Sequence, residues 1–173
     1  MSHKPILSLL SKATQWLART NIALFSLALY AIILAQRFLI HLFNDVIGIP
    51  DIKYREKLMN SNYNVTFDLV LDTLLFAPIL ERLVSQSLFF NIYNRIKINR
   101  WVIIALSSIT FGLIHNYSLV YMISTAFSGA IFMFLHIKRA QAKNKPLAST
   151  IIAHSFINST AIIAAPITQY VKK

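Results

Sequence analysis

Residues 21–43 read NIALFSLALYAIILAQRFLIHLF, an apolar stretch that is interrupted by the ionisable residues Arg37 and His41. A helix needs about 20 mostly apolar residues to cross the hydrocarbon core of a bilayer. The stretch has that length and composition. It therefore predicts a transmembrane helix, and the rest of the chain has to be interpreted with a membrane in mind.

The overall composition points the same way. Of 173 residues, 56% are hydrophobic and 13% are charged, whereas about a quarter of the residues of a soluble domain are charged. The net charge is +11, but the cations lie singly or in small clusters between apolar runs, which does not indicate a nucleic-acid surface. With 3 Gly, 5 Pro and no Cys, a many-turned barrel is disfavoured, and disulfides, thiolate ligands and a Cys nucleophile are excluded.

Further apolar segments are separated by polar ones, and together they predict about five spans. The predicted spans cover residues 21–43, 65–93, 101–115, 119–137 and 147–171. Apolar residues at helical spacing between Ile6 and Leu17 predict an interfacial helix before the first span, although a signal peptide would show a similar pattern. We therefore predict an all-α, multi-pass membrane helical bundle. It has an N-terminal part, residues 1–64, which ends in a polar loop at 44–64, and a membrane core, residues 65–173.

The distribution of Lys and Arg predicts the orientation of the chain. If all five spans cross, ten Lys and Arg residues of the loops and tails lie on one side and five on the other. Cytoplasmic loops carry the excess of cations. The N-terminus is therefore predicted to be cytoplasmic and the C-terminus external.

Glu81 is the most unusual residue of the predicted spans. An ionisable side chain near the bilayer centre costs about 2.5 to 3.5 kcal/mol on insertion scales, so such a residue is retained for a reason. The residues one helical turn away are small or polar, among them Ala77, Pro78 and Ser85, which predicts a face turned into the bundle. Pro78 is expected to bend the helix one turn before the carboxylate. The alternative is that Glu81 forms a helix-packing ion pair.

Two later segments carry residue types that complement a carboxylate. His115 ends the short third span, where a lone His is more often a packing residue. His154 and Asn158 lie four residues apart, on one face of the fifth span. We predict that these three residues converge with Glu81 inside the bundle.

The same residues carry a resemblance to a known family. Residues 77–86 read APILERLVSQ, residues 111–115 read FGLIH and residues 154–158 read HSFIN. These stretches resemble the three motifs of the CAAX prenyl protease and bacteriocin-processing (CPBP, or Abi) family, which are Glu-Glu-x-x-x-Arg, Phe-x-x-x-His and His-x-x-x-Asn. The order along the chain is also the same. The resemblance covers residues 66–171.

The resemblance implies roles for individual residues. Glu81 and His115 would activate a water molecule, and His154 and Asn158 would stabilise the oxyanion. The first motif departs from the family pattern, because Arg82 replaces the second Glu and Gln86 replaces the Arg. Arg82 is about 100° around the helix from Glu81. It is therefore expected to lie off the catalytic face and, with Gln86, to tune substrate preference through its field.

Three other sites have partial support in the sequence. Residues 126–129 read AFSG, close to the Gly-x-Ser-Gly of rhomboid serine proteases, but small residues at this spacing also indicate close helix packing. Asp68 and Asp72 have the composition of an aspartyl protease dyad, although a solvated helix start is the simpler interpretation. Glu81, His115 and His154 have the composition of a catalytic zinc site, but the sequence has no His-Glu-x-x-His motif.

These observations favour an intramembrane endopeptidase of the glutamate type. It would act on membrane-associated proteins or peptides, prenylated or not, in the cell (inner) membrane. We expect the lipid bilayer and a peptide or lipidated protein as partners, no nucleic acid and no cofactor, with zinc as the alternative. The competing hypothesis is a catalytically inactive membrane binding protein, such as a bacteriocin self-immunity factor.

Overall fold

The computed structural model describes residues 4–47 and 66–170, and within these ranges the chain is helical apart from short turns and contains no β-strand. The predicted all-α fold is confirmed. The helices are α1 (Lys4–Arg19), α2 (Ile22–Ile47), α4 (Phe67–Leu71), α5 (Ala77–Arg82), α6 (Phe89–Ile96), α7 (Arg100–Leu113), α8 (Leu119–Gln141) and α9 (Pro146–Tyr170), with π-helical segments η1 (Asp72–Phe76) and η2 (Leu83–Leu88).

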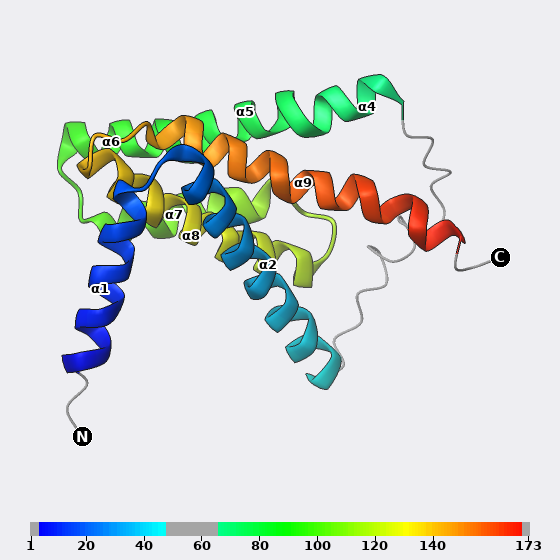
Figure 1. Cartoon of the computed structure of the whole chain (residues 1–173), viewed down its shortest axis with the longest axis horizontal. Coiled ribbons are helices and arrows are strands. Elements are labelled where there is room, and N and C mark those ends of the chain that lie inside the picture. Colours follow the sequence, from blue (N-terminus) through cyan, green and yellow to red (C-terminus); the bar gives the residue numbers. More distant parts are fainter. Residues whose placement is uncertain (1–3, 48–65, 171–173) are drawn as a thin grey trace.

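The segments from α4 to α6 follow one another as a single helical run, which lies along one side of the molecule (Figure 1). Thr66 caps its start by accepting a hydrogen bond from the Leu69 amide. Helical backbone continues through Pro78, because the π-helical segment η1 immediately precedes it. Single-turn π segments of this kind are often found at functional sites. Here η1 and η2 lie on either side of α5, which carries Glu81.

Helix α8 lies at the centre of the bundle, between the neighbouring helices α2, α7 and α9 (Figure 1). Buried apolar side chains fill the space between these helices. The larger cluster consists of Leu17, Phe25, Leu29, Ile33, Phe132, Leu135, Ala153 and Ile157. A second cluster joins α7 to α8 and consists of Ile103, Ile104, Met133 and Ile137. Burial of these side chains holds together the helices that carry the motifs.

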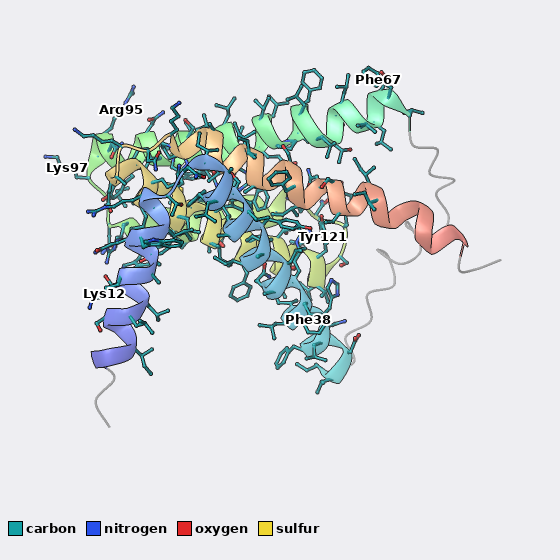
Figure 2. The ribbon with its side chains drawn as sticks, viewed as in Figure 1. Lys12, Phe38, Phe67, Arg95, Lys97 and Tyr121 are labelled. Atoms are coloured by element: carbon teal, nitrogen blue, oxygen red, sulfur yellow. The ribbon has the colours of Figure 1, made fainter. Side chains whose placement is uncertain are left out.

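Two of the described helices, α2 and α8, are both long and apolar enough to cross a membrane, and α7 is apolar but shorter. Large apolar side chains also cover the outside of the bundle. Phe38 on α2 and Phe67 on α4 point away from it in Figure 2 and are 67% and 74% exposed. Exposed apolar surface on this scale is typical of a protein surrounded by lipid. The arrangement with five spans stays a prediction.

The boundaries of two predicted segments differ from the structure. Of the predicted polar loop, residues 44–47 form the last turn of α2, and residues 48–64 lie outside the described residues. Lys138 and Arg139 were expected to begin a loop, but α8 continues to Gln141 and Arg139 is fully buried. Two nitrogens of the Arg139 guanidinium have partners there, because Nε and Nη1 donate to the carbonyl oxygens of Asn144 and Thr20 at 2.8 and 3.1 Å.

The predicted interfacial helix corresponds to α1, which projects away from the bundle (Figure 1). Only its C-terminal end is packed, through the buried side chains of Leu17 and Ala18. Ile6, Leu9 and Trp16, which belong to the predicted apolar face, are more than half exposed. Its location at a membrane interface stays a prediction.

Candidate active site

A carboxylate and two imidazoles meet where α5, the end of α7 and α9 come together. The Oε2 atom of Glu81 lies 3.5 Å from Nε2 of His115 and 3.7 Å from Nε2 of His154. These distances allow an ion pair but are longer than a direct hydrogen bond. Such loose spacing is common in ligand-free catalytic sites. Three residues that are far apart in the sequence are therefore neighbours in the structure.

The three side chains differ in the fraction of their surface that is exposed. The side chain of Glu81 is 23% exposed, that of His115 13% and that of His154 4%. Glu81 and His115 thus reach towards the surface of the bundle, whereas His154 is closed off by its neighbours. The Oε2 atom of Glu81, which faces both imidazoles, is itself buried.

The orientation of His115 is fixed by its own helix end. Its Nδ1 atom lies 2.8 Å from the carbonyl oxygen of Phe111, and the two rings are in contact with centroids 4.5 Å apart. A carbonyl oxygen can only accept, so Nδ1 carries the hydrogen in this bond. When the ring is neutral, Nε2 is therefore unprotonated and faces Glu81 as an acceptor.

Arg82 does not lie where the sequence predicted. Its side chain is fully buried and points into the bundle. The guanidinium carbon lies 4.1 Å from the ring centre of Phe111 and 4.0 Å from that of Phe132. Nε of Arg82 donates a hydrogen bond of 3.1 Å to Nδ1 of His154. The expectation that Arg82 stays off the catalytic face and acts only through its field was therefore wrong.

The physical reason is that this helical run is covered on several sides. Helix α5 packs against α9, and η2 packs against α7, α8 and α9. Side chains about 100° apart around the axis therefore both enter the interior. Ser107 of α7 donates to the carbonyl oxygen of Ser85, which joins η2 to its neighbour. Gln86 is also fully buried, so any influence of Gln86 or Arg82 on a substrate passes through the residues around them.

Asn158 is bound to the backbone of the helical run that carries Glu81. Its Nδ2 donates to the carbonyl oxygen of Thr73 at 2.9 Å, and the hydroxyl of Ser155 donates to that of Leu74 at 2.7 Å. Pro78 has no amide hydrogen, so it cannot bond to the carbonyl of Leu74, as in an α-helix, or to that of Thr73, as in a π-helix. Side chains of α9 therefore satisfy carbonyls that the helix itself leaves free. The hydrogen bond of Ser155 to this backbone was not predicted from the sequence. Pro78 was the feature that could have indicated it, because a proline leaves a carbonyl of its helix without a partner.

Several buried polar atoms at the site have no hydrogen-bond partner within the described residues. They are Oε2 of Glu81, both Nη atoms of Arg82 and both amide atoms of Gln86. Each unsatisfied buried group costs about 1–3 kcal/mol. The protein thus concentrates polar groups here that the fold alone does not satisfy, which is typical of a place where function rather than stability selects the residues.

Close packing of α7 on α8 positions Phe111, the residue that contacts Arg82, His115 and His154. A Cβ atom at Gly129 would lie 2.9 Å from Cβ of Phe111, and one at Gly112 would lie 2.9 Å from Cβ of Ala126. Helix α8 can approach α7 this closely because glycine has no side chain.

The structure does not support the two alternative protease sites. In the rhomboid-like stretch, the single O–H of Ser128 is shared between two acceptors, Oε1 of Gln36 at 2.8 Å and the Ser124 carbonyl oxygen at 3.1 Å, and neither is a histidine. Asp68 and Asp72 are both exposed at the start of the helical run, as expected for a solvated helix start. Across residues 4–47 and 66–170, no group of three or more His, Asp or Glu side chains has an arrangement that would hold a metal ion.

The fold and the site together define a class, an all-helical membrane protein with a carboxylate between two imidazoles. The family model of type II CAAX prenyl endopeptidase Rce1-like proteins matches residues 64–160. The chain therefore belongs to this family of membrane proteases, and the resemblance to the CPBP family is confirmed. Glu81, His115, His154 and Asn158 all lie in the matched region, whereas α1 and α2 lie outside it. No curated protein and no solved structure matches the chain.

Proposed function

We propose that this protein is an intramembrane endopeptidase that cleaves membrane-associated proteins or peptides with a water molecule activated by Glu81 and His115. The observation that carries the proposal is the position of the Glu81 carboxylate between Nε2 of His115 and Nε2 of His154. The proposal is also supported by the match of this chain to a family of membrane proteases.

The chemistry follows from the hydrogen-bonding capacity of each group. Glu81 takes a proton from the attacking water, and that proton reaches the leaving amine nitrogen with His115, whose Nε2 is an acceptor, as the sharing partner. The developing oxyanion needs donors aimed at it. We assign this role to His154 and to the Asn158 amide, of which one N–H is used by the Thr73 carbonyl and one remains.

The protein has an apolar pocket that could hold an isoprenoid chain of a substrate. An apolar pocket of about 650 Å³ lies between the end of α2 and the start of α8, and its lining includes Phe43, Val46, Ile123 and Phe127. The start of α8 also carries Tyr121, whose ring is 5.9 Å from the ring of His115. We propose that the chain of a prenylated substrate occupies this pocket while its peptide reaches the site.

The reaction that we propose needs no metal ion, because a carboxylate and an imidazole can activate water without one. We further propose that the protein is a multi-pass protein of the cell (inner) membrane with a cytoplasmic N-terminus. The grouping of cations supports this orientation. Lys12, Arg95 and Lys97 lie towards one end of the molecule in Figure 2, and Phe67 lies at the other.

The decisive experiment compares two carboxylate variants of the purified full chain in lipid bilayers. The probes are internally quenched peptides that end in a Cys-aliphatic-aliphatic-X sequence, with and without a farnesyl group. Glu81→Gln should lower the hydrolysis rate by at least about 100-fold, because the base is lost. The matched control is Asp68→Asn, which neutralises an exposed carboxylate on the same helical run and should leave the rate unchanged.

A second candidate function has its own structural observation. Arg82, which departs from the family motif, bonds directly to His154, and such a change is also what a decayed active site would show. In that case the protein would be a catalytically inactive binding protein, such as a bacteriocin self-immunity factor. No hydrolysis by the wild type, together with full biological effect of Glu81→Gln, would establish this alternative and overturn the enzyme.

A further inference from the structure

The hydrogen bond between Arg82 and His154 has a fixed direction. The Nε atom of Arg82 always carries a hydrogen and has no lone pair to offer, so it is always the donor. The Nδ1 atom of His154, 3.1 Å away, must therefore be the acceptor and carry no hydrogen. A neutral imidazole has one N–H, so the hydrogen of His154 resides on Nε2, the atom that faces Glu81.

Arg82 is held in this position from all sides. The guanidinium lies between the rings of Phe111 and Phe132, and the residue has no exposed surface. Stacking on both faces adds cation–π attraction and leaves little room for another side-chain rotamer. Phe111 itself is confined by its contact with Gly129. The donor therefore remains on Nδ1 of His154 as long as α7 and α8 stay packed.

We propose that Arg82 is a positioning residue that sets the tautomer of His154, so that the two histidines face Glu81 with opposite hydrogen-bonding roles. His115 bonds to the Phe111 carbonyl through Nδ1–H and presents an acceptor, whereas His154 presents an Nε2–H donor. The meaning of this asymmetry for catalysis rests on the proposed function. One imidazole then shares protons with the carboxylate, and the other donates to the developing oxyanion.

The same contact limits what His154 can do. A metal-bound histidine binds the ion through an unprotonated nitrogen and donates its other N–H to an acceptor. Arg82 supplies a donor at that place, so Nε2 of His154 is a poor metal ligand. It is also a poor general base, because accepting a proton would need the electron pair that Nε2 has already shared with its hydrogen.

A carboxylate at position 82 would reverse the arrangement. An ionised Glu can only accept, so it would hold a hydrogen on Nδ1 of His154 and leave Nε2 as an acceptor. The family motif has Glu at this position and Arg four residues later. Arg82→Glu combined with Gln86→Arg is therefore the substitution pair that should switch the tautomer.

Nitrogen-15 NMR of the full chain with labelled histidine, in lipid nanodiscs, measures the tautomer directly and requires no turnover. His154→Gln identifies the two ring signals among those of the five histidines. In the wild type we expect Nδ1 at the shift of an unprotonated ring nitrogen and Nε2 at that of a protonated one. A protonated Nδ1, alone or together with Nε2, would overturn the proposal even if the variant with Glu at position 82 does not fold.

The variants then test the cause. In Arg82→Glu/Gln86→Arg the two shifts should exchange, and unchanged shifts in the folded variant would show that Arg82 does not set the tautomer.

Arg139→Met is the matched control, because Arg139 is also buried and stacks on a ring, that of Phe25 at 4.2 Å. This control should leave the His154 shifts in place. If it moves them as the Arg82 variant does, loose packing is the cause and the proposal fails. If the protein proves not to hydrolyse peptides, the expected nitrogen shifts stay the same. Failure of the proposed function can therefore be distinguished from failure of the proposal about the His154 tautomer.

Discussion

The amide of Asn158 donates a hydrogen bond of 2.9 Å to the carbonyl oxygen of Thr73, which joins α9 to the π-helical segment before Pro78. A residue of the third motif thus holds the backbone that leads to Glu81 of the first motif. The hydroxyl of Ser155 bonds to the next carbonyl, that of Leu74. The two motifs are coupled mechanically, whatever chemistry the site performs.

Removal of either donor should destabilise the protein. Asn158→Ala and Ser155→Ala each leave a carbonyl of the helical run without its partner, which should lower the free energy of unfolding by about 1–3 kcal/mol. Denaturant unfolding in detergent micelles measures the change. Ser159→Ala is the control, because its exposed hydroxyl bonds only within α9, to the Phe156 carbonyl. Equal stability of Asn158→Ala and Ser159→Ala would contradict the coupling.

Gly129→Ala should disturb the site through Phe111. The added Cβ would lie 2.9 Å from Cβ of Phe111, and overpacking of this kind destabilises by about 1–3 kcal/mol. Because the Phe111 ring stacks on Arg82 and contacts His115, the hydrolysis rate should fall as well. Ala105→Leu adds more volume at an exposed position of α7 and should change neither property. Normal stability and rate of Gly129→Ala would show that α7 and α8 can separate freely.

Ser128→Ala separates the proposed mechanism from that of a serine protease. The hydroxyl of Ser128 bonds to Gln36 of α2 and to the Ser124 carbonyl of its own helix. Its removal should therefore weaken the contact between α2 and α8 by about 0.5–1.5 kcal/mol and leave the rate of hydrolysis per folded molecule unchanged. A rate as low as that of Glu81→Gln would instead identify Ser128 as the nucleophile.

Chelation tests the proposal that the reaction is metal-independent. Hydrolysis by the purified protein should be the same before and after exhaustive dialysis against a chelator, since the carboxylate and His115 suffice to activate water. Metal analysis of the same sample provides the control. Zinc at one equivalent, with activity that disappears on its removal and returns on its addition, would favour a zinc site formed by Glu81, His115 and His154.

The absence of natural Cys makes the topology directly measurable. Lys12→Cys, Lys97→Cys and Lys143→Cys should react with a membrane-impermeant maleimide from the cytoplasmic side, because their segments carry the excess of cations. Asn116→Cys, in the turn between α7 and α8, should react from the opposite side. Labelling of all four positions from one side would rule out the predicted arrangement with five spans.

The fold class and the candidate site residues were accessible from the sequence. Apolar runs of helical length are local properties of the chain, because hydrophobic burial and backbone hydrogen bonding act on consecutive residues. Polar residues within such runs stand out for the same reason, so Glu81, His115, His154 and Asn158 could be named in advance. Their spacing in three motifs also indicated the family, which the match over residues 64–160 shows.

The contacts of Arg82, Asn158 and Arg139 could not be predicted from the sequence. Each depends on how helices that are distant in the chain rotate about their own axes and how closely they approach one another. Arg82 enters the bundle because α7, α8 and α9 cover several sides of its helical run. Arg139 stays within α8, where its Nε and Nη1 atoms donate to the carbonyl oxygens of Asn144 and Thr20. A buried cation is stable only where partners from other segments meet it, and that meeting is a property of packing rather than of any single stretch of residues.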